Sequence, residues 1–341
     1  MTDLTAINAA LAMQWLVLGV PDSGTVPLRL PNSRKRPLMD FPGTASFRNY
    51  LPATFPQDRE IWLAPPEGPI RLSADPGPVI SFQADPDIYS VVLNKTHRLV
   101  TRWKVPCFNA PAAVLETGRE RVAAKLSGIP GLDVPRTERL SMTDPAGLES
   151  AIAAADMSWP VLVRMTGQHG GETLVKLDSP EDLYRCPDLP ASGASIYVTE
   201  FRDFRDPDGW YRKYRLVVVG RQIILRHVLI GNAWLLHALR RAPETDADEQ
   251  ARMEAFATDL LPLIQPTVLE MADRLNLDYF GIDCHIDAAG RILLFEANAC
   301  MNILHRTDPP PNMWDAPIAA VETALMDLLA HPERWRHQPA I

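Results

Sequence analysis

Three oxygen-bearing side chains interrupt an otherwise apolar stretch of the sequence. Asp283, Glu296 and Asn298 lie in "GIDCHIDAAGRILLFEAN", residues 281–298, where Ile, Leu and Phe occupy many of the other positions. The Asp-Ala-Ala-Gly segment at 287–290 is typical of a turn, so the stretch predicts a hairpin of two strands. Because an unpaired carboxylate is costly to bury, these acids need a compensating partner.

The pairing of the two strands determines which side chains meet. Directly opposed residues of a hairpin share a face, and side chains alternate between faces along each strand. A symmetrical turn pairs Asp283 with Leu294 and places Asp283, Glu296 and Asn298 on one face. Oxygen donors without a thiolate or imidazole suit Mg²⁺ or Mn²⁺ better than zinc, and such sites complete their shell with water and phosphate oxygens. A surface hairpin with solvated acids is the alternative, which the position of Glu296 inside "LLFEAN" disfavours.

Other segments must position this hairpin. "VLVRMTGQHGGETLV" (161–175) predicts a strand, a glycine-containing loop and a second strand, and "YVTEF" (197–201) predicts another strand. "WYRKYRLVVVG" (210–220) predicts a strand with Lys213 and Arg215 on one face. A plain glycine-rich hairpin, a core strand and a solvated basic face are the alternatives when each segment is taken singly. Helices are expected at 117–128, 144–156, 249–275 (interrupted at Pro262 and Pro266) and 316–329, which together indicate an α+β protein.

Composition limits the class of protein. The 341 residues can bury a sizeable core, and a net charge of −8 argues against a general nucleic-acid binder. Cys107, Cys186, Cys284 and Cys300 are scattered, which argues against structural zinc or a disulfide framework and fits a reducing cytoplasm. The apolar stretch at 9–20 follows no Lys or Arg and is too short to span a bilayer. We therefore expect a cytoplasmic protein without nucleic-acid or membrane partners.

The order of these segments resembles the ATP-grasp superfamily, which includes D-alanine:D-alanine ligase, glutathione synthetase and the ribosomal-protein-modifying glutamate ligases. G-x-D followed by apolar-apolar-E-x-N resembles the metal-binding hairpin of that family, and the resemblance covers about residues 117–302. It implies an ATP-grasp fold, in which two α+β lobes clamp ATP, preceded by an N-terminal α/β domain. The expected boundaries are 1–115 for the N-terminal domain, 116–200 for the small lobe and 201–341 for the large lobe.

The resemblance also implies site residues. Asp283, Glu296 and Asn298 would bind Mg²⁺ or Mn²⁺, and Lys213 and Arg215 would hold the transferred phosphoryl group and the substrate carboxylate as catalytic residues. Backbone N–H groups of the glycine-rich loop would approach the triphosphate, and "YVTEF" would contact the adenine edge. The implied ATP-binding residues are Arg119 (with Arg121 and Lys125 as alternatives), Arg164, Gly167, His169, Gly170, Gly171, Thr199, Glu200, Phe201 and Lys213.

Some positions depart from the family pattern. Arg119 and Arg164 stand where the family has phosphate-binding lysines, and "ACMNILHR" (299–306) replaces a Ser/Pro/Gly-rich substrate loop. The resemblance implies an ATP-dependent ligase that activates a carboxylate as an acyl phosphate and joins it to an amine, with release of ADP and phosphate. Its partners would be small-molecule or peptide carboxylates and amines. A small-molecule kinase on the same fold and a non-catalytic ATP-binding module are the alternatives, and the oligomeric state stays open.

Overall fold

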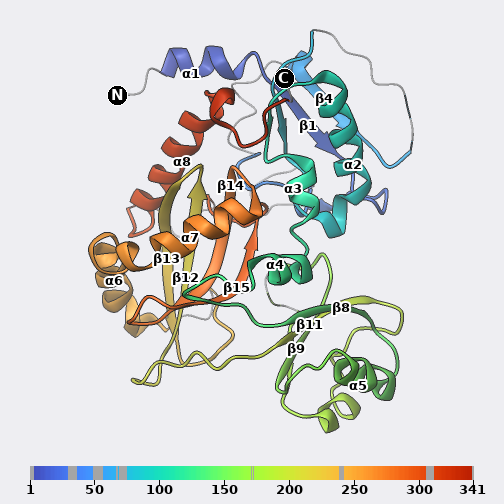
Figure 1. Cartoon of the computed structure of the whole chain (residues 1–341), viewed down its shortest axis with the longest axis vertical. Helices are drawn as coiled ribbons and strands as arrows, with labels where there is room; N and C mark the ends of the chain where they lie inside the picture. The colour runs from blue at the N-terminus through green and yellow to red at the C-terminus, as the bar shows by residue number, and fades with distance from the viewer. Residues whose placement is uncertain are drawn as a thin grey trace.

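The N-terminal part of the chain forms a parallel sheet flanked by helices (Figure 1). The computed structural model describes residues 4–29, 37–48, 57–66, 68, 75–169, 171, 173–237, 242–304 and 311–339. Within this described part the first sheet has the order β4-β1-β5-β6, and every neighbouring pair is parallel. Its elements are α1 (Leu4–Leu11), β1 (Trp15–Gly19), β4 (Glu60–Leu63), β5 (Val79–Ser81), α2 (Pro86–Trp103), β6 (Cys107–Phe108) and α3 (Pro111–Leu115).

Helix α2 begins in a way that later bears on the site. Asp85 is its N-cap, and its carboxylate accepts a hydrogen bond of 2.8 Å from the backbone N–H of Asp87. Pro86 occupies the first turn, where a missing N–H costs nothing. Asp85 and Asp87 therefore stand together at the N-terminus of a long helix, a position that favours negative charge.

The second sheet belongs to a separate small lobe at the lower right of Figure 1. It is antiparallel with the order β10-β9-β11-β8. Helix α5 begins at the N-cap Asp144, whose carboxylate accepts from the N–H of Gly147. The elements of this lobe are β8 (Thr137–Ser141), α5 (Pro145–Ala154), β9 (Val161–Met165), β10 (Val175–Leu177), the 3-10 helix Pro180–Tyr184 and β11 (Ser195–Glu200).

The third sheet carries the predicted metal-binding hairpin. Its order is β13-β12-β14-β15-β7, with β7 parallel to β15 and the other pairs antiparallel. Helices α6, α7 and α8 accompany it, and Pro266 lies inside α7 rather than ending it. The elements are β7 (Leu132–Asp133), β12 (Tyr211–Val219), β13 (Gln222–Gly231), α6 (Asp246–Asp259), α7 (Leu261–Leu275), β14 (Tyr279–Ile286), β15 (Ile292–Asn298) and α8 (Asp315–Leu329). Short segments between residues 116 and 136 also reach this sheet: β7 pairs with β15, and α4 (Arg119–Leu126) packs against α7.

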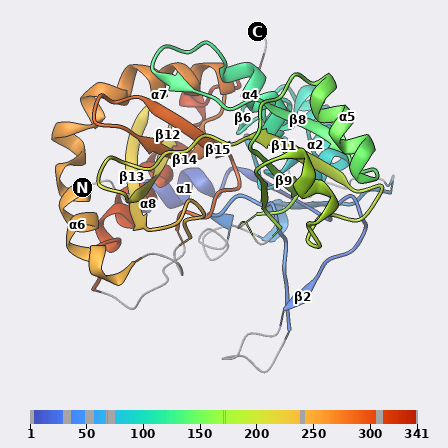
Figure 2. The same cartoon turned by 90° about the horizontal axis from the view of Figure 1, so that it is seen from below.

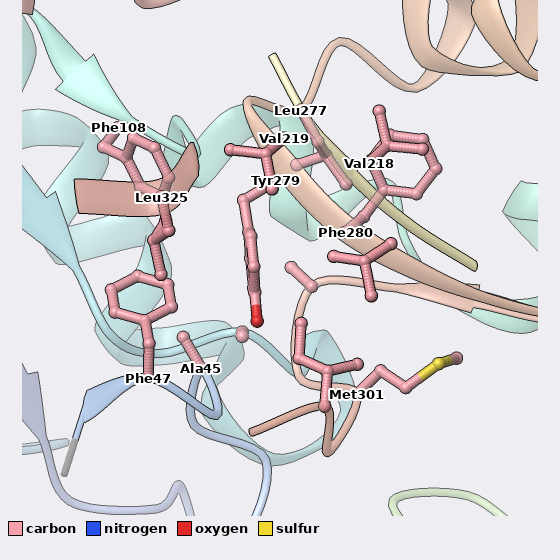
Figure 3. Packing of buried hydrophobic residues seen from close by; sticks show 14 of the residues in the cluster. Ala45, Phe47, Phe108, Val218, Val219, Leu277, Tyr279, Phe280, Met301 and Leu325 are labelled. Atoms are coloured by element: carbon pink, nitrogen blue, oxygen red, sulfur yellow. The ribbon is translucent and has the colours of Figure 1, made fainter. Parts of the chain in front are cut away.

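One hydrophobic core connects the first and third sheets. Figure 3 shows Phe47 and Phe108 of the N-terminal part beside Tyr279 of β14, and the rings of Phe47 and Tyr279 meet edge to face with centroids 5.1 Å apart. Asn109 adds polar contacts, because its side chain donates to the carbonyl of Tyr279 and accepts from the Tyr279 N–H, at 2.7 and 2.9 Å. The small lobe has a distinct core around Leu148, Val163 and Ile196.

A two-stranded ribbon reaches away from the body of the molecule (Figure 2). It pairs β2 (Leu28–Arg29) with β3 (Leu38–Met39), and Leu28 and Met39 are exposed. Within the described ranges, no helix is both long and apolar enough to cross a membrane. Gly170, an expected phosphate-loop residue, lies outside the described residues.

Candidate active site between the lobes

The hairpin brings the predicted metal ligands together through a register that differs from the expected one. Asp283 stands directly opposite Glu296, and the pairing of Asp283 with Leu294 is wrong, because Leu294 pairs with Cys284. An irregularity between Asp283 and Cys284 shifts the register by one residue on the β15 side. The shift preserves the shared face of the two acids, since Asp283 and Glu296 become a directly opposed pair.

Lys213 and Arg215 of β12 both contact Asp283. Arg215 Nε and Nη2 donate to the two carboxylate oxygens at 2.7 and 2.8 Å, and Lys213 Nζ lies 3.3 Å from Oδ2. Burial opposes ionisation of Asp283, but these two cations outweigh it and hold the pKa of the carboxyl below its ordinary value. The alternation predicted for β12 is confirmed, since Tyr214 and Leu216 are fully buried on the other face.

Glu296 is compensated by a different cation. Arg119 Nη2 lies 2.6 Å from Glu296 Oε1, and Asn298 Nδ2 donates to the same oxygen at 2.5 Å. Burial would raise the pKa of Glu296, but Arg119 and His169 outweigh it and hold the pKa well below its ordinary value. The two other candidates for the upstream cation lie elsewhere: Arg121 pairs with Glu116 on the surface, and the cavity lining includes Arg119 but not Lys125.

Arg164 is a buried cation without a carboxylate partner among the described residues. It lies on β9, opposite Tyr197 of β11, and its Nη2 donates to the carbonyl of Gln168. Its Nε has no hydrogen-bond partner within the described part of the chain. Burial, followed by the charge of Arg119, lowers the pKa of Arg164 to about 10. A guanidinium in this state is suited to receive an anion.

The glycine-rich loop has the expected backbone freedom but faces the N-terminal part of the chain. Gly167 and Gly171 adopt positive φ values of 68° and 82°, which glycine tolerates readily. The N–H of Gly167 donates to Asp87 at 3.3 Å, and Gly167 does not line the main cavity. His169 Nε2 lies 2.7 Å from Asp85 Oδ2, while His169 and Gly171 both line the main cavity. Sequence reasoning missed Asp85 and Asp87, because nothing in the sequence near them indicates contact with this loop.

The predicted hinge segment lies at the apolar end of the cavity. Thr199, Glu200 and Phe201 all line it, and Phe201 meets Trp234 edge to face at 5.6 Å. The carboxylate of Glu200 accepts from the N–H of Ser158 at 2.8 Å and from Arg202 at 2.6 Å. Glu200 is thus occupied by protein partners, whereas Phe201 and Trp234 present flat apolar surface that suits an aromatic ring.

These residues line one cavity of about 510 Å³ between the small lobe and the third sheet. Pocket volumes of about 300–1,000 Å³ are typical for small-molecule sites. Five Lys and Arg side chains face three carboxylates, an excess of two positive charges that favours an anionic ligand. Sequence reasoning missed much of the apolar wall and the loop after β15: Phe204, Trp234, Leu235, Leu236, Leu293, Leu294, Phe295, Cys300, Met301 and Asn302.

The oxygen donors fit a hard divalent cation. Asp283 and Glu296 are opposed on neighbouring strands, and Asn298 lies two residues after Glu296 on the same face. Each carboxylate is paired with a cation from another segment, which keeps both carboxylates charged, and charged carboxylates are the ligands that Mg²⁺ prefers. The amide oxygen of Asn298 accepts from the N–H of Cys300 at 3.0 Å in this arrangement, which leaves the two carboxylates as the main donors.

Comparison with solved structures identifies the fold. No protein-family model and no curated protein matches this chain. D-alanine–D-alanine ligase from Bacillus anthracis superposes with a TM-score of 0.50 at 10% identity, over 94% of this chain and 98% of that chain. The same enzyme complexed with ATP gives 0.50 at 9% identity over 95% and 98%, and a RimK domain protein ATP-grasp from Sphaerobacter thermophilus gives 0.47 at 12% over 92% and 98%. At these identities the two superpositions with a TM-score of 0.50 show the architecture alone: the chain has the ATP-grasp fold that its sequence predicts.

Proposed function

We propose that this protein is an ATP-dependent ligase that activates a carboxylate and joins it to an amine. The observation that carries the proposal is the convergence of Arg119, Arg164, Lys213 and Arg215 with the opposed pair Asp283 and Glu296 in one cavity. The cavity also has an apolar end, as a nucleotide requires. The fold is shared with a D-alanine–D-alanine ligase whose structure is complexed with ATP, which supports ATP as the nucleotide for this cavity.

The polar end of the cavity would hold the triphosphate. Arg164 has no carboxylate partner among the described residues, so a phosphate oxygen would satisfy a buried charge that protein groups leave open. Arg119 lies next to it and would share the phosphate charge while still holding Glu296 in place. The base and ribose would lie toward Phe201 and Trp234.

The metal ligands would be Asp283, Glu296 and Asn298. A magnesium ion held there would neutralise negative charge on the phosphate groups. Lys213 and Arg215 pair with Asp283 and line the cavity, where they would also hold the substrate carboxylate and the γ-phosphoryl group. These residues act by positioning and by fixed charge, since phosphoryl transfer demands little other chemistry from the protein.

The proposed reaction has two steps. A carboxylate oxygen of the substrate attacks the γ-phosphorus, and the bond between that phosphorus and the β,γ-bridging oxygen breaks. ADP leaves, and the substrate becomes an acyl phosphate. The nitrogen of a bound amine then attacks the acyl carbon, phosphate leaves with the former carboxylate oxygen, and the amine loses a proton. The acids and amines would be small molecules or peptides.

Isotope transfer tests the proposal. The enzyme is screened with carboxylates and amines for ADP release, and the active acid is then labelled with ¹⁸O. We expect one labelled oxygen in the released phosphate, and hydroxylamine in place of the amine should trap a hydroxamate. Release of AMP would contradict the proposal. ADP with a stable phosphorylated product and no label transfer would instead identify a kinase, and ATP binding without any turnover would identify a binding module.

A further inference from the structure

Three side chains of different chemistry meet beside the phosphate loop. His169 Nε2 lies 2.7 Å from Asp85 Oδ2 and 3.8 Å from Cys300 Sγ, and all three ligand atoms lie within 4.8 Å of one another. They come from three segments: the start of α2, the glycine-rich loop and the loop after β15. With Zn–N bonds of about 2.0–2.1 Å and Zn–S bonds of about 2.3 Å, tetrahedral ligand atoms stand roughly 3.3–3.6 Å apart. The Nε2–Sγ separation of 3.8 Å is close to this range. The Nε2–Oδ2 separation of 2.7 Å is that of a hydrogen bond, which an ion would replace by widening it.

The cluster has room for an ion. Asp85, His169 and Cys300 line a cavity of about 30 Å³ that adjoins the main one. The residues that line both cavities are Arg119, His169, Glu296, Asn298 and Cys300. Because a water molecule needs a cavity volume of about 10–15 Å³, a single ion or water fits there. Ala84 and Pro86, from the start of α2, also line the small cavity.

A buried hydroxyl without a hydrogen-bond partner lies in the same part of the molecule. Tyr89, four residues after Asp85, is fully buried, and its hydroxyl has no hydrogen-bond partner within the described part of the chain. The charges that act on this hydroxyl are those of Arg48, Asp85, Asp40 and Cys300. Buried polar atoms without partners are rare, so the polar groups around the start of α2 are incompletely satisfied by the protein.

The ligand types select the kind of metal. A carboxylate oxygen, an imidazole nitrogen and a thiolate sulfur together favour zinc over magnesium, and three protein ligands leave one position for water. We propose that Asp85, His169 and Cys300 form a binding site for a zinc-type divalent cation, distinct from the oxygen donors Asp283, Glu296 and Asn298. Such an ion joins the N-terminal part, the phosphate loop and the loop after β15, so it fixes the phosphate loop in its observed position.

Cobalt is the probe for this site, because a thiolate bound to Co²⁺ gives a near-ultraviolet charge-transfer band. Metal-free full-length protein is titrated with Co²⁺ and then with Zn²⁺, without ATP or Mg²⁺. We expect one thiolate-bound Co²⁺ per chain and displacement by Zn²⁺, with a rise in melting temperature on Zn²⁺ binding. Cys300→Ser should abolish the band and weaken Zn²⁺ binding more than about 100-fold, since losing even an outer-shell partner costs about 10–100-fold.

Three further variants keep the test decisive. Cys186→Ser is the matched control, since Cys186 is also a half-buried free cysteine but lies far from the cluster in the small-lobe core. Asp85→Asn keeps an N-cap for α2 and should still weaken Zn²⁺ binding. Asp283→Asn should retain the cobalt band even if turnover is lost, which separates this proposal from the proposed function. The proposal is wrong if wild-type protein gives no thiolate band, if Cys186→Ser loses it equally, or if Cys300→Ser keeps wild-type Zn²⁺ affinity.

Discussion

The small lobe and the N-terminal part of the chain pack against the rest of the molecule in different ways. The N-terminal sheet and the third sheet share one hydrophobic core, which includes Phe47, Phe108 and Tyr279 (Figure 3). The small lobe keeps a separate core around Val163 and Ile196. The N-terminal sheet is therefore joined to the third sheet by continuous apolar packing, whereas the small lobe keeps its own core and adds polar contacts at its boundary.

The polar contacts of the small lobe gather on the start of α2. Asp87 accepts hydrogen bonds from Arg139 at 2.6 Å and from the hydroxyl of Tyr197 at 2.7 Å, besides the N–H of Gly167. Apolar burial contributes about 25 cal/mol per Å² and needs no particular geometry, whereas exposed ion pairs contribute about 0–1 kcal/mol each. The N-terminal sheet and the third sheet therefore share a core, whereas Asp87 holds the small lobe through polar contacts.

The largest expected effect is at the opposed acids of the large lobe. Asp283→Asn and Glu296→Gln remove a charge that the proposed metal needs, so each should lower kcat/KM at least about 10²–10³-fold. The fold should persist, because each substitution keeps the shape of the side chain and an oxygen that accepts hydrogen bonds. Turnover is measured with saturating Mg²⁺, and circular dichroism checks folding. Full activity in both variants, or wild-type turnover in excess chelator, would falsify the metal assignment.

Large-to-small substitutions in the two hydrophobic cores should destabilise different regions of the molecule. Tyr279→Ala should cost about 3–5 kcal/mol and loosen the N-terminal domain and the large lobe together, because its ring is buried in their shared core. Ile196→Ala should cost about 2–5 kcal/mol and loosen only the small lobe. Hydrogen exchange resolves the regions affected. Equal loosening of all three regions by both variants would mean that the molecule has a single cooperative core.

The free energy of unfolding should also depend on pH through Asp278, which lies where the N-terminal part meets the third sheet. Burial raises the pKa of this carboxyl to about 6, although it accepts hydrogen bonds from the N–H groups of Asn109 and Arg336. Because the folded pKa lies above the unfolded value of about 3.9, the contribution is fully present below pH 3.9 and is lost as pH rises through 6. The loss amounts to about 3 kcal/mol.

Urea unfolding of the wild type and of Asp278→Asn, from pH 4 to pH 7, measures this contribution as the difference between the two proteins. Residue 278 cannot ionise in the variant, so the variant's free energy of unfolding should not fall with pH on account of this residue. The acids of the cavity behave alike in both proteins and cancel in the difference. Parallel pH profiles for the variant and the wild type would contradict the assignment.

A substitution at Arg164 tests whether the small lobe supplies a positive charge that binds the phosphates of ATP. Arg164→Ala should raise the Kd for ATP about 10–100-fold, because a charged hydrogen bond contributes about 1.5–3 kcal/mol. Arg205→Ala is the control, since Arg205 contacts the hydroxyl of Tyr211 outside the cavity lining and should change ATP binding little. Calorimetric titration compares them. Equally mild effects would make Arg164 a structural residue.

The smallest expected effect is at the polar attachment itself. Arg139→Ala removes the ion pair with Asp87 that crosses from the small lobe to α2, and it should raise the KM for ATP about 2–5-fold, less so at high salt. Arg136→Ala is the matched control, because Arg136 pairs with Glu138 within the small lobe. If both variants shift KM alike, the contact with Asp87 does not hold the lobe.

Much of the site could be predicted because its residues lie on strands with simple alternation. Lys213 and Arg215 were placed on one face of β12 by the two-residue period, and the structure confirms that face. The register of the hairpin could not be predicted, since an irregularity beside Asp283 depends on the fit of β14 and β15 in the whole sheet. The sequence predicts that the N–H of Gly167 approaches phosphate, and it could not predict the hydrogen bond of this N–H to Asp87, which lies 80 residues earlier in the chain.

The sequence by itself determined the order of the segments, the basic face of β12 and the acids of the hairpin, because these depend on periods of a few residues and on turn chemistry. Only the tertiary structure decided which segments meet. His169 lies 84 residues from Asp85 and 131 from Cys300, and the four scattered cysteines gave no metal-binding spacing. Contacts over such distances follow from how three sheets pack around shared and separate cores. No local pattern specifies that packing, because burial of apolar surface is non-directional.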